Sequence, residues 1–402
     1  MDAKSIGYMI ATLRKRSKMT QTQLAAKLMV SGKTISKWEN GLGYPEITQF
    51  PVISQLFGVS IDYIMTGERK GISLAGSILA DLVKTVDCYP KPGMLAHISS
   101  VSRAVGGCVP NTGINLAKID RSIPISAIGK VGDDEYGRFV ISRLQKYGID
   151  TGRICISATA PTSFSDVISM PSGERTFFHA KGANAEFAPS DVELTSLNCR
   201  ILHIGYILLL DRFDSPDEDY GTRMARFLHE VQARGIKISI DLVSDSTAEY
   251  AEKIVPVLPY CNYVIVNEIE CCTIWGINPY DKNGDIAPEN IRLAMEKTAQ
   301  CGVQDKVIVH CKSCGFLLNV ATDEFICVSS LKIPKEEIRG NVGAGDAYCA
   351  GCLYGIYNDF SDLKILEFAS AAAAANLFAE NSVDGMLPKD EIFKLPAKYG
   401  RI

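Results

Sequence analysis

The sequence predicts an α/β protein: a mostly parallel, doubly wound sheet in residues 71–402, preceded by a small all-α domain in residues 1–70. Three observations predict this division. Beyond residue 70, apolar runs of strand length alternate with helical stretches. Before it, apolar residues recur at helical spacing. The chain, at 402 residues, also exceeds what one core usually holds, and residues 66–71 have the polar, glycine-containing composition of a linker.

Composition is typical of a soluble globular protein. Apolar residues make up 47% and charged residues 22%, which excludes a disordered chain. No run of about 18 apolar residues is present to span a bilayer. The first four residues lead into a helix-like pattern, so we expect a cytoplasmic protein without a membrane partner. The 13 cysteines indicate reduced thiols and not a disulfide framework.

Charge is unevenly distributed along the chain. The formal net charge is −4, yet residues 1–70 carry ten Lys/Arg against five Asp/Glu. A small basic domain on a large acidic one indicates that residues 1–70 are the part that meets a polyanion.

The helices of the N-terminal domain follow from apolar spacing and caps. Two helices are predicted before and after a turn at residues 17–19, with Thr20 as the second N-cap and Gln23 completing a capping box. A third helix, residues 33–40, buries Ile35 and Trp38, and two more follow by residue 64. The other face of the third helix carries short polar and basic groups suited to base edges and phosphates: Lys33, Thr34, Ser36 and Lys37.

Residues 1–70 resemble the Xre/Cro-type helix-turn-helix domain. The matching residues are Thr20-Gln21-xx-Leu24-Ala25, Ser31-xx-Thr34-Ile35-Ser36-Lys37-Trp38-Glu39-Asn40-Gly41, Pro45 and Phe57-Gly58-Val59-Ser60-Ile61-Asp62-Tyr63. The resemblance implies binding to double-stranded DNA. The implied contacts are Gln21 and Ser31 to phosphates and Lys33, Thr34 and Lys37 in the major groove. An amphipathic bundle with a solvated basic face is the alternative.

The C-terminal part begins with a strand predicted over residues 72–79. The spacing Gly76-Ser77-xxx-Asp81 puts a carboxylate at the end of this strand, where open α/β sheets bind ligands. Further strands are expected at residues 123–128, 201–210, 236–243, 263–266 and 306–310, and helices at residues 134–147, 220–234 and 289–300. Alternation between residues 164 and 178, around Pro171-Ser172-Gly173-Glu174, indicates an antiparallel hairpin that forms a lid.

A glycine-rich stretch, residues 340–347, is predicted to be a loop that opens a helix. Gly343 and Gly345 can take positive φ, and the free N–H groups of the helix N-terminus attract an anion such as phosphate. Asp346 lies at the helix start, where the macrodipole favours its ionised form, so it is a candidate base beside a phosphoryl donor. A glycine-rich connector with a capping aspartate is the alternative.

Two further groups are candidates for ligand binding. Gly106 and Gly107 form a second glycine turn at a helix start, where Asn111 offers a donor and an acceptor to a polyhydroxyl ligand. Asn267 and Glu270 follow a strand and can hold Mg²⁺ through water. Taken alone, the first is more typical of a simple turn and the second of a surface pair.

Together and in this order, the motifs resemble those of the ribokinase-like (PfkB-type) sugar kinases across residues 72–390. The matching pieces are Gly76-Ser77-xxx-Asp81, Gly106-Gly107-xxx-Asn111, Gly129-xx-Gly132-Asp133-Asp134-xx-Gly137, Gly173-Glu174-Arg175-Thr176, Asn267-xx-Glu270 and Gly343-Ala344-Gly345-Asp346-Ala347. The resemblance implies a three-layer α/β/α fold with a small β lid. It also implies transfer of the ATP γ-phosphate to a sugar or nucleoside hydroxyl, with ATP and Mg²⁺ as cofactors.

The resemblance implies roles for single residues as well. Asp346 would be the base, and Gly343, Ala344 and Gly345 the anion hole. The implied binding residues are Asp81, Gly107 and Asn111 for the sugar, Asn267, Glu270, Lys312 and Gly315 for the nucleotide, and Glu270 for Mg²⁺ through water.

Two departures from the family pattern bear on activity. Gly340 and Asn341 stand where the family usually has Asp-Thr, which removes a carboxylate associated with activation by monovalent cations. Lys312 stands where the nucleotide loop normally has glycine, so it either restricts the nucleotide or adds a phosphate contact.

We interpret the cysteine pairs and three histidines of the chain as structural residues and not as metal or redox sites. Cys311-xx-Cys314 and Cys349-xx-Cys352 have the spacing of zinc or redox sites, but we assign no metal to them, and the second pair falls inside the helix after Asp346. Three histidines in apolar runs are expected in the core or lid: His179, His203 and His310.

The sequence therefore predicts a MgATP-dependent carbohydrate kinase coupled to a sequence-specific DNA-binding domain. The alternative is a sugar-responsive transcriptional regulator whose kinase fold binds ligand with little or no turnover. Kinase domains of this class often pair through their lids, and a helix-turn-helix reads a palindrome as a pair, so we expect a homodimer.

Overall fold

The protein is described by a computed structural model that covers residues 2–170, 175–243 and 250–402. Contacts divide the chain into two compact units. The first comprises Met1–Gly71 with Val192–Arg200, and the second comprises Ile72–Asp191 with Ile201–Ile402. The domain boundary after residue 70 stays a prediction.

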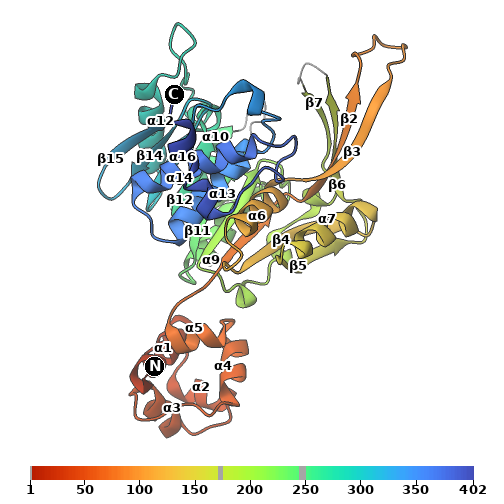
Figure 1. Ribbon diagram of the computed structural model, residues 1–402. Helices are drawn as coiled ribbons and strands as arrows, with labels where there is room; N and C mark the ends of the chain where they lie inside the picture. Colours follow the sequence, from red (N-terminus) through yellow and green to blue (C-terminus); the bar gives the residue numbers. More distant parts are fainter. Residues whose placement is uncertain (1, 171–174, 244–249) are drawn as a thin grey trace. The chain divides into compact units, whose positions relative to one another are not determined.

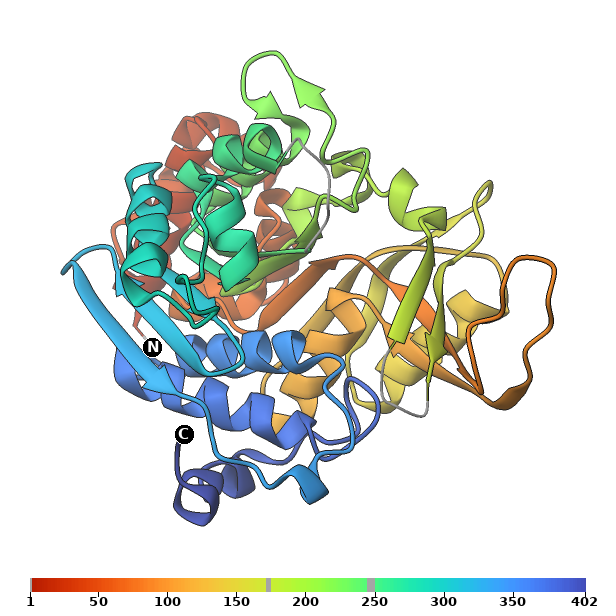
Figure 2. The same ribbon diagram turned by 90° about the horizontal axis from the view of Figure 1, so that it is seen from above.

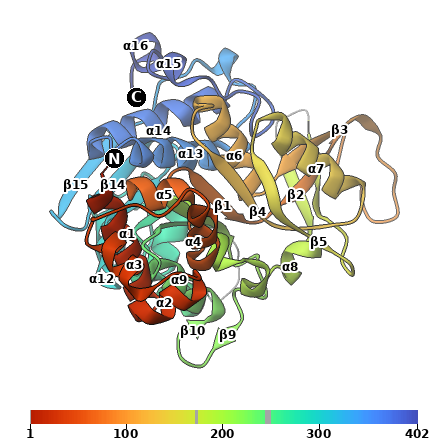
Figure 3. The same cartoon turned by 90° about the horizontal axis from the view of Figure 1, so that it is seen from below.

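The N-terminal unit is a group of short helices around one apolar core (Figure 3). The helices are α1 (Ala3–Arg16), α2 (Gln21–Lys27), α3 (Gly32–Glu39), α4 (Gln49–Phe57) and α5 (Ile61–Thr66). The predicted capping box is confirmed: the Thr20 hydroxyl accepts the Gln23 N–H, and the Gln23 side chain accepts the Thr20 N–H. Ile35 and Trp38 are buried on α3, as their spacing predicts.

The second unit is built on a sheet with the strand order β15-β14-β13-β12-β11-β8-β1-β4-β5 in the described part of the chain. Pairing is parallel from β13 to β5 and antiparallel among β13, β14 and β15. The strands are β1 (Ile72–Gly76), β4 (Ile125–Gly132), β5 (Asp150–Ser157), β8 (Ile201–Ile207), β11 (Lys237–Leu242), β12 (Tyr263–Asn267), β13 (Lys306–His310), β14 (Cys314–Asn319) and β15 (Glu324–Ser329). Of these, β5, β14 and β15 had no counterpart among the predicted strands.

Helices cover both faces of this sheet, which confirms the three-layer α/β/α architecture (Figures 1 and 2). One face carries α6 (Cys108–Ile119), α7 (Glu135–Lys146), α13 (Ala344–Tyr357) and α14 (Asp362–Asn376). The other carries α9 (Arg223–Gln232), α10 (Tyr250–Ile254), α11 (Glu268–Thr273) and α12 (Pro288–Gln300). Other short α-helices and strands are α8 (Gly182–Glu186), β9 (Pro216–Asp217), β10 (Gly221–Thr222), α15 (Lys389–Ile392) and α16 (Leu395–Tyr399).

Small residues let α13 and α14 approach closely. A Cβ added at Gly351 would lie 2.6 Å from the Ala369 Cα, so only glycine fits this crossing. Cys349 and Cys352 are buried in the same helix, as expected for a packing role.

A second, smaller sheet has the order β3-β2-β6-β7 and projects from the main one (Figure 1). Its strands are β2 (Leu79–Val86), β3 (Ile98–Gly106), β6 (Ser163–Ser169) and β7 (Arg175–Ala180). Pairing of β6 with β7 confirms the predicted hairpin, whose turn, Pro171-Ser172-Gly173-Glu174, lies outside the described residues. The sequence missed the β2–β3 hairpin, which supplies the other half of this lid.

The single strand predicted over residues 72–79 is wrong. Strand β1 ends at Gly76, whose φ of 133° suits glycine, and an added Cβ there would lie 2.3 Å from the Gly205 carbonyl oxygen. The chain leaves the main sheet at this point and enters the lid as β2. Asp81 therefore lies in the lid sheet and not at the end of the first strand.

No helix in the described residues is long and apolar enough to cross a membrane.

Candidate active site

The glycine-rich loop leads directly into α13. Gly343 is the N-cap, with φ 73°, and a Cβ there would lie 2.4 Å from the Ser382 Cβ, so the loop requires glycine at this position. Ala344, Gly345 and Asp346 form the first turn. Of the two glycines that can take positive φ, Gly343 does so, and Gly345 has a helical backbone.

The Asp346 carboxylate is buried and receives hydrogen bonds from two side chains. Asn111 Nδ2 donates to Oδ2 at 3.0 Å, and the Tyr206 hydroxyl lies 3.1 Å from Oδ1 and 3.0 Å from Oδ2. Burial is the largest influence and, with the neighbouring Asp241, raises the pKa of Asp346 to about 7, although the two hydrogen bonds oppose this. The macrodipole is expected to favour the ionised form of Asp346, but burial and Asp241 outweigh this effect, and the net pKa lies above the usual value of an aspartate.

Asp241, at the end of β11, is connected to Asp346 through Tyr206. Its Oδ1 accepts the Tyr206 backbone N–H at 2.6 Å, and its Oδ2 lies 3.3 Å from His203 Nε2. The Ser239 hydroxyl lies 3.0 Å from His203 Nδ1, so both ring nitrogens of this imidazole have partners. His203 is thus a core histidine, as expected.

Tyr206 is one of the residues of this site that sequence reasoning missed. It is the penultimate residue of β8 and has φ 60°, a conformation that non-glycine residues seldom adopt. In this position its backbone N–H meets Asp241 while its hydroxyl meets Asp346. The sequence feature that could have identified Tyr206 is its position as a polar side chain at the carboxyl end of a buried parallel strand.

Asn376 was missed as well, because its role depends on a contact between α14 and the glycine loop. Its side-chain amide donates to the Val342 carbonyl at 2.8 Å and so holds the loop in place.

Two cavities meet at the N-terminus of α13. The smaller, about 290 Å³, is lined by Asp241 and Asp346 among others. The larger, about 540 Å³, is lined by Lys312 among others. His310 and Gly345 line both cavities, so a ligand in the larger one can extend toward Asp346. His310, expected in the core or lid, therefore borders both binding spaces; burial lowers its pKa to about 4 and keeps it neutral.

Asp81 reaches the region of Asp346 from the lid sheet. Burial raises the pKa of Asp81 to about 7, and Arg175 on β7 opposes this shift. Gly106 leaves room for the carboxylate, since an added Cβ would lie 2.5 Å from Asp81 Oδ2. The charge of Asp81 also contributes to the raised pKa of Asp346, after burial and Asp241.

Gly107 and Asn111 begin α6, as the sequence predicts. Gly107 is the N-cap, with φ 87°, and an added Cβ would lie 2.5 Å from the Ser77 carbonyl oxygen. Asn111 Oδ1 is buried and has no hydrogen-bond partner among the described residues. An acceptor in this state suits a ligand hydroxyl, because buried polar groups normally find a partner.

Asn267 and Glu270 lie together at the end of β12 and the start of α11. They form a capping box, in which Asn267 Oδ1 accepts the Glu270 N–H at 2.8 Å and Glu270 Oε2 accepts the Asn267 N–H at 3.0 Å. Both line the smaller cavity with Asp241 and Asp346. Carboxylate and amide oxygens in one cavity are the donor set that Mg²⁺ prefers.

A different set of donors lies against Asp241. Within the described ranges, His203, Asp241 and Cys349 are a buried group whose ligand atoms lie within 4.8 Å of one another, close enough to hold a metal ion. Cys349 Sγ lies 3.6 Å from His203 Nε2, so these groups already contact one another directly. Burial, with Asp241 nearby, raises the pKa of Cys349 and keeps its thiol neutral.

The nucleotide-loop residues occupy different environments. Lys312 is exposed and lines the larger cavity together with Asn341. Gly315 is buried on β14, where an added Cβ would lie 1.9 Å from the Tyr348 hydroxyl oxygen. Close packing against Tyr348 explains this glycine, and its assignment to nucleotide binding stays a prediction.

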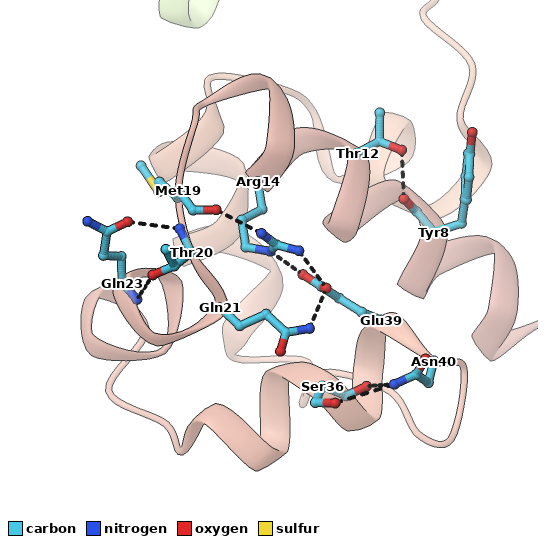
Figure 4. Close-up of polar contacts among 10 residues, drawn as sticks. All are labelled: Tyr8, Thr12, Arg14, Met19, Thr20, Gln21, Gln23, Ser36, Glu39 and Asn40. Atoms are coloured by element: carbon cyan, nitrogen blue, oxygen red, sulfur yellow. Dashed lines mark hydrogen bonds and ion pairs between the residues drawn. The ribbon is translucent and has the colours of Figure 1, made fainter.

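A polar network joins α1, α2 and α3 in the N-terminal unit (Figure 4). Arg14 donates from Nε to Glu39 Oε1 at 2.6 Å, from Nη2 to Glu39 Oε2 at 2.9 Å, and from Nη1 to the Met19 carbonyl at 2.7 Å. Gln21 Nε2 donates to Glu39 Oε2 at 2.8 Å. Burial raises the pKa of Glu39, but the bonds from Arg14 and Gln21 outweigh it and lower the pKa overall. The Gln21 amide nitrogen is therefore engaged within the protein, and its phosphate contact stays a prediction.

The predicted DNA-facing residues share one side of α3. Lys33 and Lys37 are exposed, and Thr34 is half-buried between them. Ser31 is the N-cap of α3, and its hydroxyl accepts the Thr34 N–H at 3.1 Å.

Replacing Glu39 with alanine is expected to destabilise the N-terminal unit by about 3 kcal/mol, because it leaves Arg14, only 12% exposed, without its carboxylate. In a Trp275→Phe background, Trp38 is the only tryptophan left of the two, so its fluorescence during urea unfolding reports on this unit. Glu46→Ala, at an exposed position, is the matched control and should change stability little. Equal effects of the two substitutions would contradict a stabilising role for the network.

Comparison with known proteins gives matches over both parts of the chain. A family model described as pfkB family carbohydrate kinase matches residues 70–390, and one described as helix-turn-helix matches residues 10–64. Fructokinase-1 of Oryza sativa subsp. japonica is 25% identical over 347 residues, covering 82% of this chain and 99% of that protein. The 5-dehydro-2-deoxygluconokinase of Geobacillus thermodenitrificans is 25% identical over 317 residues, covering 72% of this chain and 83% of that protein.

The structure also resembles a solved one. Arabidopsis thaliana ribokinase complexed with ribose and ATP matches with a TM-score of 0.66 at 20% identity, covering 82% of this chain and 99% of that one. At this identity the likeness shows a shared fold.

Proposed function

Because the chain belongs to the pfkB family of carbohydrate kinases and carries a helix-turn-helix at its N-terminus, we propose that it phosphorylates a sugar or related small carbohydrate with MgATP and couples this to sequence-specific DNA binding. The observation that carries the kinase proposal is the buried Asp346 at the N-terminus of α13, where two cavities meet. Phosphoryl transfer needs a base for the hydroxyl, donors for the transferred charge and in-line positioning, and this arrangement supports all three.

Asp346 is the proposed base. Its ionised carboxylate accepts the proton of the sugar hydroxyl, and a pKa near 7 matches a base that works at neutral pH. Backbone N–H groups of Gly343, Ala344 and Gly345 lie at the positive end of α13, where they stabilise negative charge on the group in transit. Bound ATP supplies the phosphoryl group.

The sugar is proposed to lie between the lid and α6. Asp81 contributes an acceptor from β2, and the free Oδ1 of Asn111 contributes another from α6. Gly107 keeps the start of α6 free of a side chain, so the backbone can approach the sugar closely.

The larger cavity fits a nucleotide by size and position. Its volume of about 540 Å³ is in the range of small-molecule sites, and Lys312 is placed to contact a phosphate. Asn267 and Glu270 are the proposed holders of Mg²⁺ in the adjoining cavity, since hard cations prefer oxygen ligands and keep part of their water.

The experiment that tests the kinase proposal is ADP release with MgATP across fructose, ribose, 5-dehydro-2-deoxygluconate and nucleosides. The panel follows the names of the relatives, which are fructokinase, ribokinase and 5-dehydro-2-deoxygluconokinase. Turnover with one substrate class is the expected result.

A sugar-responsive regulator with little turnover is the second candidate. Asn341 and Lys312, both departures from the family pattern, line the larger cavity, which favours altered nucleotide use. Thermal stabilisation by one sugar, with no ADP release from any, would establish this candidate in place of the kinase.

DNA binding is proposed to use the exposed face of α3. Replacing both Lys33 and Lys37 with alanine should weaken binding and make it less salt-dependent, with the log–log salt slope reduced by roughly one for each phosphate that the variant no longer neutralises. Fluorescence anisotropy on a DNA selected with the full chain measures this. The control, Lys15→Ala with Arg16→Ala, removes two exposed charges from the end of α1 and should leave sequence preference unchanged. Equal losses of DNA affinity in both variants would show that the basic charges attract DNA in general and that α3 does not recognise its sequence.

A homodimer formed through the lid is proposed on the basis of exposed apolar side chains there. Val101 on β3 is 67% exposed, and Phe177 and Phe178 on β7 are 54% and 60% exposed. Exposed apolar groups gathered on one small sheet are typical of an interaction surface. Sedimentation of the full chain tests this, and a monomer at all concentrations would contradict it.

A further inference from the structure

The turn between β13 and β14 places two thiols side by side at the edge of the larger cavity. Cys311 and Cys314 are separated by Lys312 and Ser313, and their Sγ atoms lie 3.4 Å apart. Cys311 also lines the cavity. Neither thiol takes part in the proposed phosphoryl transfer.

From this geometry we propose that Cys311 and Cys314 are a modification site, in which peroxide converts the two thiols to a reversible disulfide. The Cys311 N–H donates to the Cys314 carbonyl at 2.9 Å, so the two residues face each other across the hairpin. Hydrogen-bonded partners in an antiparallel pair have Cα atoms about 5.5 Å apart. A disulfide needs its two Cα atoms to be about 4.4–6.8 Å apart, so the bond can form here without moving the backbone far.

The reaction balances with peroxide as the oxidant. The Cys311 thiolate attacks one peroxide oxygen, the O–O bond breaks, and Cys311 becomes a sulfenic acid while hydroxide leaves as water. Cys314 sulfur then attacks the Cys311 sulfur, an S–S bond forms, and the S–O bond breaks to release a second water. Two thiols and one peroxide thus yield one disulfide and two waters.

The surroundings favour Cys311 as the attacking sulfur. A hydrogen bond from Cys314 is the largest influence and lowers the pKa of the Cys311 thiol, with Ser313 acting in the same direction. The hydrogen bond to Cys311, together with burial, in turn raises the pKa of Cys314. One sulfur is therefore ready to react while its neighbour is positioned to resolve the product.

The thiols of Cys349, Cys352 and Cys88 do not combine a neighbouring thiol with a lowered pKa. Cys349 and Cys352 share the Cys-xx-Cys spacing but are buried in α13, and burial raises the pKa of both. Cys88 is exposed, but slight desolvation and the neighbouring Asp87 raise the pKa of its thiol. Cys327, on β15, is the competing partner for Cys314, because it also interacts with the Cys314 thiol.

Closing the disulfide has a consequence for the cavity. It draws the two sulfurs from 3.4 Å to about 2.05 Å and so restrains the turn that carries Lys312. This consequence rests on the proposed nucleotide site. We expect the oxidised chain to bind ADP roughly threefold more weakly, as when one exposed cation no longer reaches a phosphate.

The experiment maps thiols in the full-length chain after treatment with hydrogen peroxide, alkylation and digestion with trypsin. Trypsin cuts after Lys312, so a Cys311–Cys314 disulfide appears as two peptides joined together, and dithiothreitol should separate them. In Cys314→Ser, Cys311 should stop at a sulfenic acid that dimedone traps. Cys349 and Cys352 should be alkylated only after unfolding.

Three results would overturn the proposal: separate alkylation of Cys311 and Cys314 after peroxide, oxidation past sulfenic acid at Cys311 in the unmodified sequence, or a Cys314–Cys327 bond. ADP affinity is measured separately before and after oxidation. A reduced chain that binds no ADP would contradict the nucleotide site, while the peptide map still decides the disulfide.

Discussion

Asp346→Asn is expected to lower kcat by about 10²–10⁴-fold, the range that a general base contributes. The amide keeps the shape of the side chain but takes no proton from a sugar hydroxyl. ADP release with the substrate found in the panel measures the loss. Asp323→Asn, on a surface turn where the residue has φ 57° and asparagine is tolerated, is the matched control and should retain full activity.

The stability of the Asp346→Asn variant distinguishes lost chemistry from lost structure. The pKa of Asp346 is raised to about 7 on folding, so between about pH 4 and pH 7 the folded chain holds a proton that the unfolded chain has released. The contribution of Asp346 to stability therefore falls as pH rises through this window, and above it the folded chain carries a buried charge. The variant lacks that charge, so its melting temperature at pH 8 should equal or exceed that of the parent chain. A large drop in melting temperature would instead assign the activity loss to misfolding.

Local rules predicted the elements of this protein whose causes are local. The capping box at Thr20 and Gln23, the start of α13 after Gly343, and the helix start at Gly107 each depend on residues within four positions of one another. The ordered motifs also placed Asp346 and Asn111 in one site, and the structure joins them by a hydrogen bond across 235 positions of sequence.

Features that depend on distant contacts could not be predicted in this way. The end of β1 at Gly76 is set by the close approach of Gly205, which lies on another strand, so the apolar run appeared to continue. The net pKa of Asp346 depends on burial and on Asp241, both invisible in a helix-start motif. Local sequence therefore placed Asp346 at the start of the helix but gave the wrong protonation tendency, because desolvation exceeds the effect of a helix dipole.

The pH dependence of kcat/KM should report this protonation directly. This ratio follows ionisations of the free enzyme, and Asp346 acts as a base only when it is deprotonated. We therefore expect kcat/KM to fall as pH drops below about 7, the pKa of Asp346. A profile that stays flat down to pH 5 would contradict Asp346 as the titrating base.

Tyr206→Phe should move that profile toward higher pH, because the Tyr206 hydroxyl, 3.0 Å from Asp346 Oδ2, stabilises the ionised carboxylate. Losing a hydrogen bond to a charged group corresponds to roughly one pH unit or more. At pH 7 a rise of one unit should make the variant roughly fivefold slower, yet it should recover near pH 9, which sets a positioning residue apart from a merely structural one. Tyr399→Phe, which removes a hydroxyl bonded to Glu337 instead, is the matched control and should leave the profile in place. An equal loss at every pH in Tyr206→Phe would mean that the hydroxyl supports the fold and does not tune the base.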